Sequence, residues 1–166
     1  MFTIGDTVLY GATGVCRIDS TVTREIGGSE QTYFVLKPLA KEKCTVFVPT
    51  ENEALKAKMR KILSAEEIEA VIADVKTLPD IWEENELRRR ESYSAIIHSG
   101  DRRQIMLLIR TLYNVEQERR KEGKRLHLAD ERFLAEAERL LYDEFSAVLG
   151  IDPSEVVPFI IERMEK

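Results

Sequence analysis

Apolar and polar positions along the first sixty residues alternate with the short period that is typical of β-strands. The β-rich runs cover residues 7–10, 15–26, 30–38 and 44–48. Glycines separate them, and Gly27-Gly28-Ser29 supplies the positive φ angles of a tight hairpin. We expect a bulge near Asp19-Ser20 and a closing strand within 59–63. The pattern predicts a small, strongly bent β-barrel of SH3-like size.

The hydrophobic period changes at Ser64. Ser64 and Glu67 form a predicted capping box, and apolar residues then recur at helical spacing. Helices are expected from 64 to about 78, from 83 to 98, after Asp101, from about 128 to Gly150, and after Asp152. The chain is therefore predicted to be α+β, with a barrel over 1–63, a linking helix over 64–79 and an all-helical domain of about four to five helices over 80–166.

Composition narrows the class of protein. The 166 residues carry a net charge of -5, so DNA binding would need a local basic face. Cys16 and Cys44 lie in expected strands without a CxxC partner, which predicts reduced core thiols and no zinc site. The N-terminus lacks the features of a signal peptide, and no apolar run approaches the ~20 residues that span a bilayer. We expect a soluble, cytoplasmic protein without a membrane partner.

Catalytic signatures are absent from the sequence. There is no phosphate-binding loop, no dinucleotide fingerprint and no HExxH motif. The two histidines, His98 and His127, are far apart and lie at expected helix ends. The sequence therefore predicts a protein that is not an enzyme, with no catalytic residues, no cofactor and no metal. An enzyme of unfamiliar chemistry is the weakest alternative.

Basic residues gather between residues 88 and 125. This stretch holds eleven basic and five acidic residues, a local charge of +6. As a group these residues are an adequate footprint for phosphate contacts, although a solvated helix face is the better explanation of any single arginine. The candidate DNA-contacting residues are Arg88, Arg89, Arg90, Arg119, Arg120, Lys121, Lys124 and Arg125.

Trp82, the only tryptophan, precedes this basic stretch. It has two interpretations: a packing residue in the core or between domains, or an exposed aromatic that stacks on an opened base step of DNA. We carry it as a further candidate DNA contact.

The chain resembles the CarD family of bacterial transcription regulators over nearly its whole length. In the barrel the resemblance lies in Gly5-Asp6-Thr7-Val8-Leu9-Tyr10, Gly14-Val15, Tyr33-Phe34-Val35-Leu36-Lys37 and Val46-Phe47-Val48-Pro49. In the helical part it lies in Arg88-Arg89, Ser99-Gly100-Asp101, Leu112-Tyr113 and the stretch 135–141.

This resemblance implies a Tudor-like barrel that binds the β subunit of RNA polymerase by strand pairing. It implies a helical half that touches promoter DNA at the upstream edge of the melted region, where a tryptophan of the family wedges into the minor groove. The result would be a more stable open complex. We expect such a protein to be a monomer, associated with the nucleoid through the polymerase.

Individual positions match the family unevenly. Of the two polymerase-contacting arginines, one matches Arg24 and the other is replaced by Phe47. The position of the wedge tryptophan is occupied by Glu86, one helical turn after Trp82. Arg88 and Arg89 match basic positions of the family.

A second hypothesis is a protein-interaction adaptor whose helical half mediates oligomerisation without touching DNA. Capture of the RNA polymerase β subunit as the dominant partner from lysate would favour the first hypothesis only.

Overall fold

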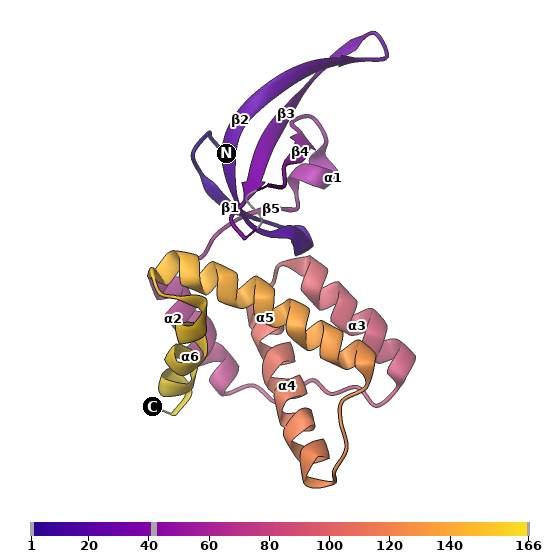
Figure 1. Ribbon diagram of the computed structural model, residues 1–166, viewed down its shortest axis with the longest axis vertical. Coiled ribbons are helices and arrows are strands. Elements are labelled where there is room, and N and C mark those ends of the chain that lie inside the picture. Colours follow the sequence, from indigo (N-terminus) through magenta and orange to yellow (C-terminus); the bar gives the residue numbers. More distant parts are fainter. Residues whose placement is uncertain (1, 41–42, 166) are drawn as a thin grey trace. The chain divides into compact units, whose positions relative to one another are not determined.

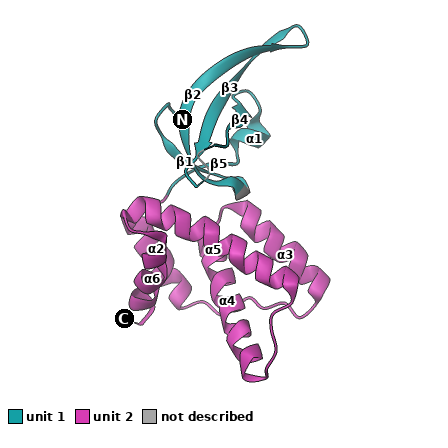
Figure 2. Ribbon diagram, in the orientation of Figure 1, with its two compact units in different colours: residues 1–62 teal, residues 63–166 magenta. Residues whose placement is uncertain are grey.

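Apolar side chains form two separate clusters, one in each half of the chain. The structure is a computed structural model that describes residues 2–40 and 43–165. It divides into residues 1–62 and residues 63–166, coloured separately in Figure 2. The first unit is built of strands and the second of helices, which confirms the predicted α+β class.

The first unit is one bent antiparallel sheet. Its strands are β1 (Thr7–Tyr10), β2 (Gly14–Ile26), β3 (Ser29–Pro38), β4 (Val46–Pro49) and β5 (Met59–Lys61). They follow the order β4-β3-β2-β1-β5, so β4 and β5 are the two edges among the described strands. The core side is filled by Val8, Cys16, Ile18, Leu36, Val48 and Met59. Two short helical segments complete the unit: η1 (Gly11–Thr13) connects the neighbouring strands β1 and β2, and α1 (Glu53–Lys56) lies in the connection between the two edge strands β4 and β5.

The β2–β3 hairpin is longer than the rest of the sheet. Strand β4 pairs only with residues 33–36 of β3, so the far part of the hairpin is a two-stranded ribbon, visible as the long curved arm in Figure 1. The register shifts between Ile18 and Ser20, where the sequence predicts a bulge. Gly27 and Gly28 form the turn with φ values of 60° and 83°, also as predicted.

One prediction for the first unit is wrong. Cys16 is buried as expected, but Cys44 is exposed and lies before β4, which begins at Val46. The apolar neighbour Val46 suggested a strand position for Cys44, yet the paired register reaches only from Val46 to Pro49. Cys44 is therefore a surface thiol.

The second unit is a helical bundle around α5. Its helices are α2 (Ala65–Lys76), α3 (Glu86–Ser99), α4 (Arg102–Lys121), α5 (Leu128–Leu149) and α6 (Val156–Glu165), with a 3-10 turn η2 (Pro153–Glu155) before α6. Helix α5 contacts α2, α3, α4 and α6. This central position explains why apolar residues line α5 over most of its length.

Local signals in the sequence set the helix ends. Ser64 accepts a hydrogen bond from Glu67 N, and Glu67 accepts one from Ser64 N, so the capping box is complete. Asp101 caps α4 through the backbone N–H groups of its first turn. Gly100 and Gly150 end α3 and α5 in the left-handed conformation.

Helix α2 belongs to the helical bundle. Its buried residues Ile68, Val71, Ile72 and Val75 are part of the same apolar cluster as α3, α4 and α5. The expected separate linking helix over 64–79 is thus integrated into the second unit, because its apolar face needs partners to bury it. Within residues 2–40 and 43–165, the helices lack the length and apolar character required to traverse a bilayer.

Candidate functional site

The outer face of the sheet carries an aromatic and cationic cluster. Phe47 lies opposite Val35 in the register and therefore points away from the core, which Val48 faces. Phe47 is 44% exposed. The Arg24 guanidinium lies 5.1 Å from the centroid of its ring, and Tyr33 meets it edge-on at a centroid distance of 6.3 Å. We call this the Arg24–Tyr33–Phe47 cluster.

The cluster lies beside the edge strand β4. Because β4 pairs only with β3 in the described sheet, half of its backbone groups face outward. An extended strand of another protein can bind such an edge, and neighbouring side chains then give specificity. Arg24 and Phe47, the two residues predicted to bind the polymerase, are thus brought together at one edge. Tyr33 is the member that the sequence analysis missed, although strand alternation places it on the same face as Val35.

Trp82 is half-buried against the helical core. The guanidinium of Arg89 lies 4.4 Å from the centroid of the Trp82 ring, and that of Arg119 lies at 5.9 Å. Beside Trp82 is an open groove of about 380 Å³ whose rim includes Asp80, Glu84, Glu118 and Glu122. Three of these carboxylates are ion-paired, Asp80 with Arg110, Glu118 with Lys121 and Glu122 with Lys124. The packing interpretation of Trp82 is favoured over the wedge, because its ring packs against the helical core and the Arg89 guanidinium.

Asp80, on that rim, is kept ionised by its hydrogen-bond partners. Asp80 accepts hydrogen bonds from Arg110 Nε at 2.9 Å and from Asn114 Nδ2 at 3.0 Å. Burial alone would raise the pKa of Asp80, but these hydrogen bonds and the charge of Arg110 outweigh it and lower the pKa below its ordinary value. Asp80 therefore stays ionised at neutral pH.

Arg89 is buried, which contradicts its predicted role as a DNA contact. It is 3% exposed, and its Nε and Nη2 donate to the two carboxylate oxygens of Asp130, both at 3.0 Å. Its Nη1 donates to the Glu83 carbonyl at 3.0 Å. Burial would lower the pKa of Arg89, but the hydrogen bonds and charge of Asp130 raise it above the ordinary value. Arg89 thus joins α3, α5 and the segment before α3.

Most other cations of the basic stretch are also paired. Besides Arg89–Asp130, the ion pairs of these cations include Arg90–Glu86, Arg102–Glu144, Arg103–Asp74, Arg110–Asp80, Arg120–Glu116, Lys121–Glu118 and Lys124–Glu122. Among the described residues, Arg88, Arg119 and Arg125 have no carboxylate within 4.0 Å. The excess of basic residues in the sequence is therefore largely neutralised in the fold.

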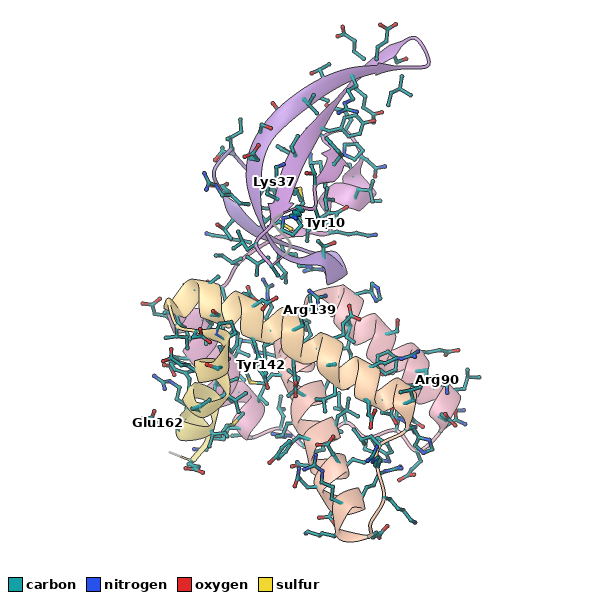
Figure 3. The ribbon with its side chains drawn as sticks, viewed as in Figure 1. Tyr10, Lys37, Arg90, Arg139, Tyr142 and Glu162 are labelled. Carbon is teal, nitrogen blue, oxygen red and sulfur yellow. The ribbon has the colours of Figure 1, made fainter. Side chains whose placement is uncertain are left out.

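The pairs near the end of α4 are weak. The side chains of Arg120, Lys121 and Lys124 are 67%, 72% and 69% exposed. Pairs at such exposure contribute about 0–1 kcal/mol, so a phosphate can replace the carboxylate at little cost. A depression of about 470 Å³ is lined by Arg120, Lys124 and Arg125 together with the carboxylates of Glu116 and Glu131. Arg90 projects outward from α3 in Figure 3, in an exposed pair of the same kind.

A second buried ion pair lies near the start of the helical unit. Glu144 is 1% exposed and accepts hydrogen bonds from Arg102 Nε at 2.9 Å and Arg102 Nη2 at 2.7 Å. It also accepts one from the Leu63 backbone N–H at 3.0 Å. Glu144 thus holds the backbone at Leu63, just before α2. In the part of the chain that the structure describes, no three His, Cys, Asp or Glu residues are arranged to hold a metal ion.

Two family models match the chain. The model of the CarD-like/TRCF RID domain matches residues 2–63, and that of the CarD C-terminal domain matches residues 67–160. The chain belongs to the CarD family. CarD-like proteins are non-enzymatic transcription factors, and the RID match implies an interaction with RNA polymerase. The two matches correspond closely to the sheet unit and the helical unit.

Proposed function

We propose that this CarD-family protein binds the RNA polymerase β subunit through the β4 edge and the Arg24–Tyr33–Phe47 cluster. The polymerase then holds a weakly basic helical surface near promoter DNA, and the added contacts stabilise the open complex. Such an association would place the protein, as a monomer, on the nucleoid. The observation that carries the proposal is an exposed aromatic cluster beside an unpaired strand edge in a unit that matches the RID model.

The chemistry of the cluster suits a protein partner. Aromatic residues and arginine are the types that most often dominate the binding energy of protein interfaces. Phe47 is exposed, but Arg24 and Tyr33 pack against its ring and restrict its position. A partner strand added to β4 would therefore meet a pre-organised side-chain surface.

The proposed DNA contacts are few and without sequence specificity. Arg88 and Arg125 are exposed and carry no ion pair among the described residues, and Arg120, Lys121 and Lys124 can exchange weak pairs for phosphates. Three or four such contacts give low affinity that falls steeply with salt. Tethering to polymerase compensates, because it replaces a bimolecular encounter by a high local concentration.

The polymerase contact is tested by binding of the full-length protein to RNA polymerase. Phe47→Ala and Arg24→Glu are each expected to weaken binding at least about tenfold, as for residues central to an interface. Arg17→Glu is the matched control, since Arg17 is an exposed arginine on the same strand outside the cluster. Equal binding of all four proteins would overturn the assignment of this edge.

The DNA contact is tested by the lifetime of open promoter complexes. Arg88→Ala with Arg125→Ala is expected to shorten the lifetime while polymerase binding stays unchanged. Lys76→Ala with Arg132→Ala removes the same number of exposed charges outside the basic stretch. An unchanged lifetime for the first pair, or an equal loss for both pairs, would refute these residues as DNA contacts.

A further inference from the structure

The net charges of the two units have opposite signs, and the helical unit is the negative one. Residues 1–62 hold nine Lys and Arg against seven Asp and Glu, a net charge of +2. Residues 63–166 hold 16 basic against 23 acidic residues, a net charge of -7. The helical unit, which carries the proposed DNA contacts, is thus the acidic one. Any polyanion near the protein is attracted more by the sheet unit.

Much of the positive charge of the sheet unit lies in one short segment. Four cations lie within six residues on α1, the following turn and the edge strand β5, and we call them the β5 strip: Lys56, Lys58, Arg60 and Lys61. From residue 54 to residue 65 the chain has no acidic residue. The strip is therefore an uninterrupted cationic segment in a chain that is otherwise acidic.

Two members of the strip lie on either side of Met59, the first residue of β5. Met59 points into the core and is 4% exposed, so Arg60 points to the other face of the strand. Lys58 lies in the turn before β5 and is exposed. Lys58 is held at its backbone, whose carbonyl accepts a hydrogen bond from Gly11 N at 3.1 Å.

The outward cations of the strip are free of carboxylates. Lys58 and Arg60 have no acidic group within 4.0 Å in the described parts of the chain. Lys56 is paired with Glu53 at 3.4 Å, a contact between partly and largely exposed groups that is weak. In contrast, eight of the eleven cations at 88–125 are ion-paired with a carboxylate within 4.0 Å.

We propose that the β5 strip binds the phosphate backbone of duplex DNA. Lysine on an edge strand also prevents edge-to-edge aggregation. Lys58 and Arg60 have no carboxylate within 4.0 Å among the described residues, and an arginine can bind a phosphate of a nucleic-acid backbone bidentately. Strand β5, which carries Arg60 and Lys61, lies at the other end of the strand order from β4, so a partner strand paired with β4 does not occupy the outer side of β5.

This proposal rests on the proposed function in one respect: the polymerase brings DNA to the protein. The sheet unit would then hold both the polymerase and a stretch of DNA. Binding by the strip is independent of base sequence, because phosphate contacts carry no sequence information.

The test uses the full-length protein and a 20-base-pair duplex at about 50 mM salt. We expect the backbone amide signals of Arg60 and Lys61 to shift in the NMR spectrum during titration with the duplex. Lys58→Gln with Arg60→Gln is expected to weaken DNA binding about tenfold and to reduce the slope of log K against log salt by about 1.8, from two lost phosphate contacts. Lys37→Gln with Lys43→Gln removes two cations elsewhere in the unit, and Lys37 is labelled on β3 in Figure 3.

The outcomes separate this proposal from the proposed function. Unshifted β5 signals, or equal loss of affinity in the control pair, would overturn the β5 strip as a DNA site. Shifts with polyglutamate but not with DNA would overturn it in favour of an acidic protein partner. Phe47→Ala is expected to reduce polymerase binding and to leave DNA binding by the β5 strip unchanged. If Phe47→Ala does not reduce polymerase binding, the proposed function is contradicted, but the β5 strip as a DNA site is not. Unchanged thermal unfolding of the variants shows that the fold is intact.

Discussion

At the scale of single residues, three charged side chains occupy positions that helical periodicity reserves for the core. Arg89 precedes Tyr93 and Ile96 on the buried face of α3, and Asp130 and Glu144 lie on the buried stripe of α5. Each of the three is at most 3% exposed. A charge at such a position requires an ionic partner, because an unpaired buried charge is strongly unfavourable. Arg89 therefore stabilises the fold.

Replacing Arg89 tests this assignment. Arg89→Met leaves the Asp130 carboxylate buried without its partner, so we expect a loss of about 3–5 kcal/mol in the free energy of unfolding. Arg88→Met is the matched control, an exposed neighbour whose replacement is expected to change stability by less than about 0.5 kcal/mol. Urea unfolding followed by circular dichroism measures both, and the emission of Trp82 reports its loss of the stacked guanidinium. Equal stability of the two variants would contradict the assignment.

The two cysteines differ in environment and hence in reactivity. Burial raises the pKa of the Cys16 thiol to about 11, whereas Cys44 is exposed. Because the thiolate is the reactive form, a disulfide reagent such as DTNB should modify one thiol in the native protein at pH 8 and two in guanidinium chloride. Cys44→Ser should abolish the native reaction. Rapid modification of two thiols in the native protein would contradict the burial of Cys16.

At the scale of secondary structure, the joint before α2 is held by a long-range contact. Strand β5 ends at Lys61, and the N–H of Leu63 already donates to Glu144 of α5. Only Ile62 separates the last strand residue from this fixed point. Glu144 thus positions the start of the helical unit, together with the capping box at Ser64.

Glu144→Gln is expected to loosen this joint. The variant keeps the shape of the side chain but removes the charge that Arg102 binds, so stability should fall by roughly 3 kcal/mol and the Leu63 amide should exchange hydrogen faster. Glu136→Gln on the same helix is the control, because its pair with Arg139 is partly exposed. Unchanged exchange at Leu63 in the Glu144 variant would show that the contact does not hold the joint.

The elements themselves follow from local sequence, whereas the ion pairs do not. Alternation and glycine turns predicted β1 and the β2–β3 hairpin, and capping residues predicted the starts of α2 and α4, because these features depend on near neighbours. Arg89 and Asp130 are 41 residues apart, and Arg102 and Glu144 are 42 apart. Pairing over such distances depends on packing of α3, α4 and α5. Counting charges over residues 88–125 therefore overestimates how many cations are available to bind DNA.

At the scale of the whole molecule, we propose that the sheet unit binds a protein partner and that separate surfaces of the molecule bind DNA weakly. Neither the acidic helical unit nor the β5 strip offers enough contacts for tight DNA binding alone. Function then depends on the tether, and weakening the tether should abolish the effect on DNA even when every DNA-contacting residue is present.

The lifetime of a heparin-challenged open promoter complex tests this claim most directly. At a protein concentration that half-saturates the effect of the wild type, Phe47→Ala should give the lifetime of polymerase alone, and a roughly tenfold higher concentration should restore the longer lifetime by mass action. The Arg17→Glu control should behave as the wild type. A Phe47→Ala protein that lengthens the lifetime as well as the wild type at the lower concentration would contradict the account.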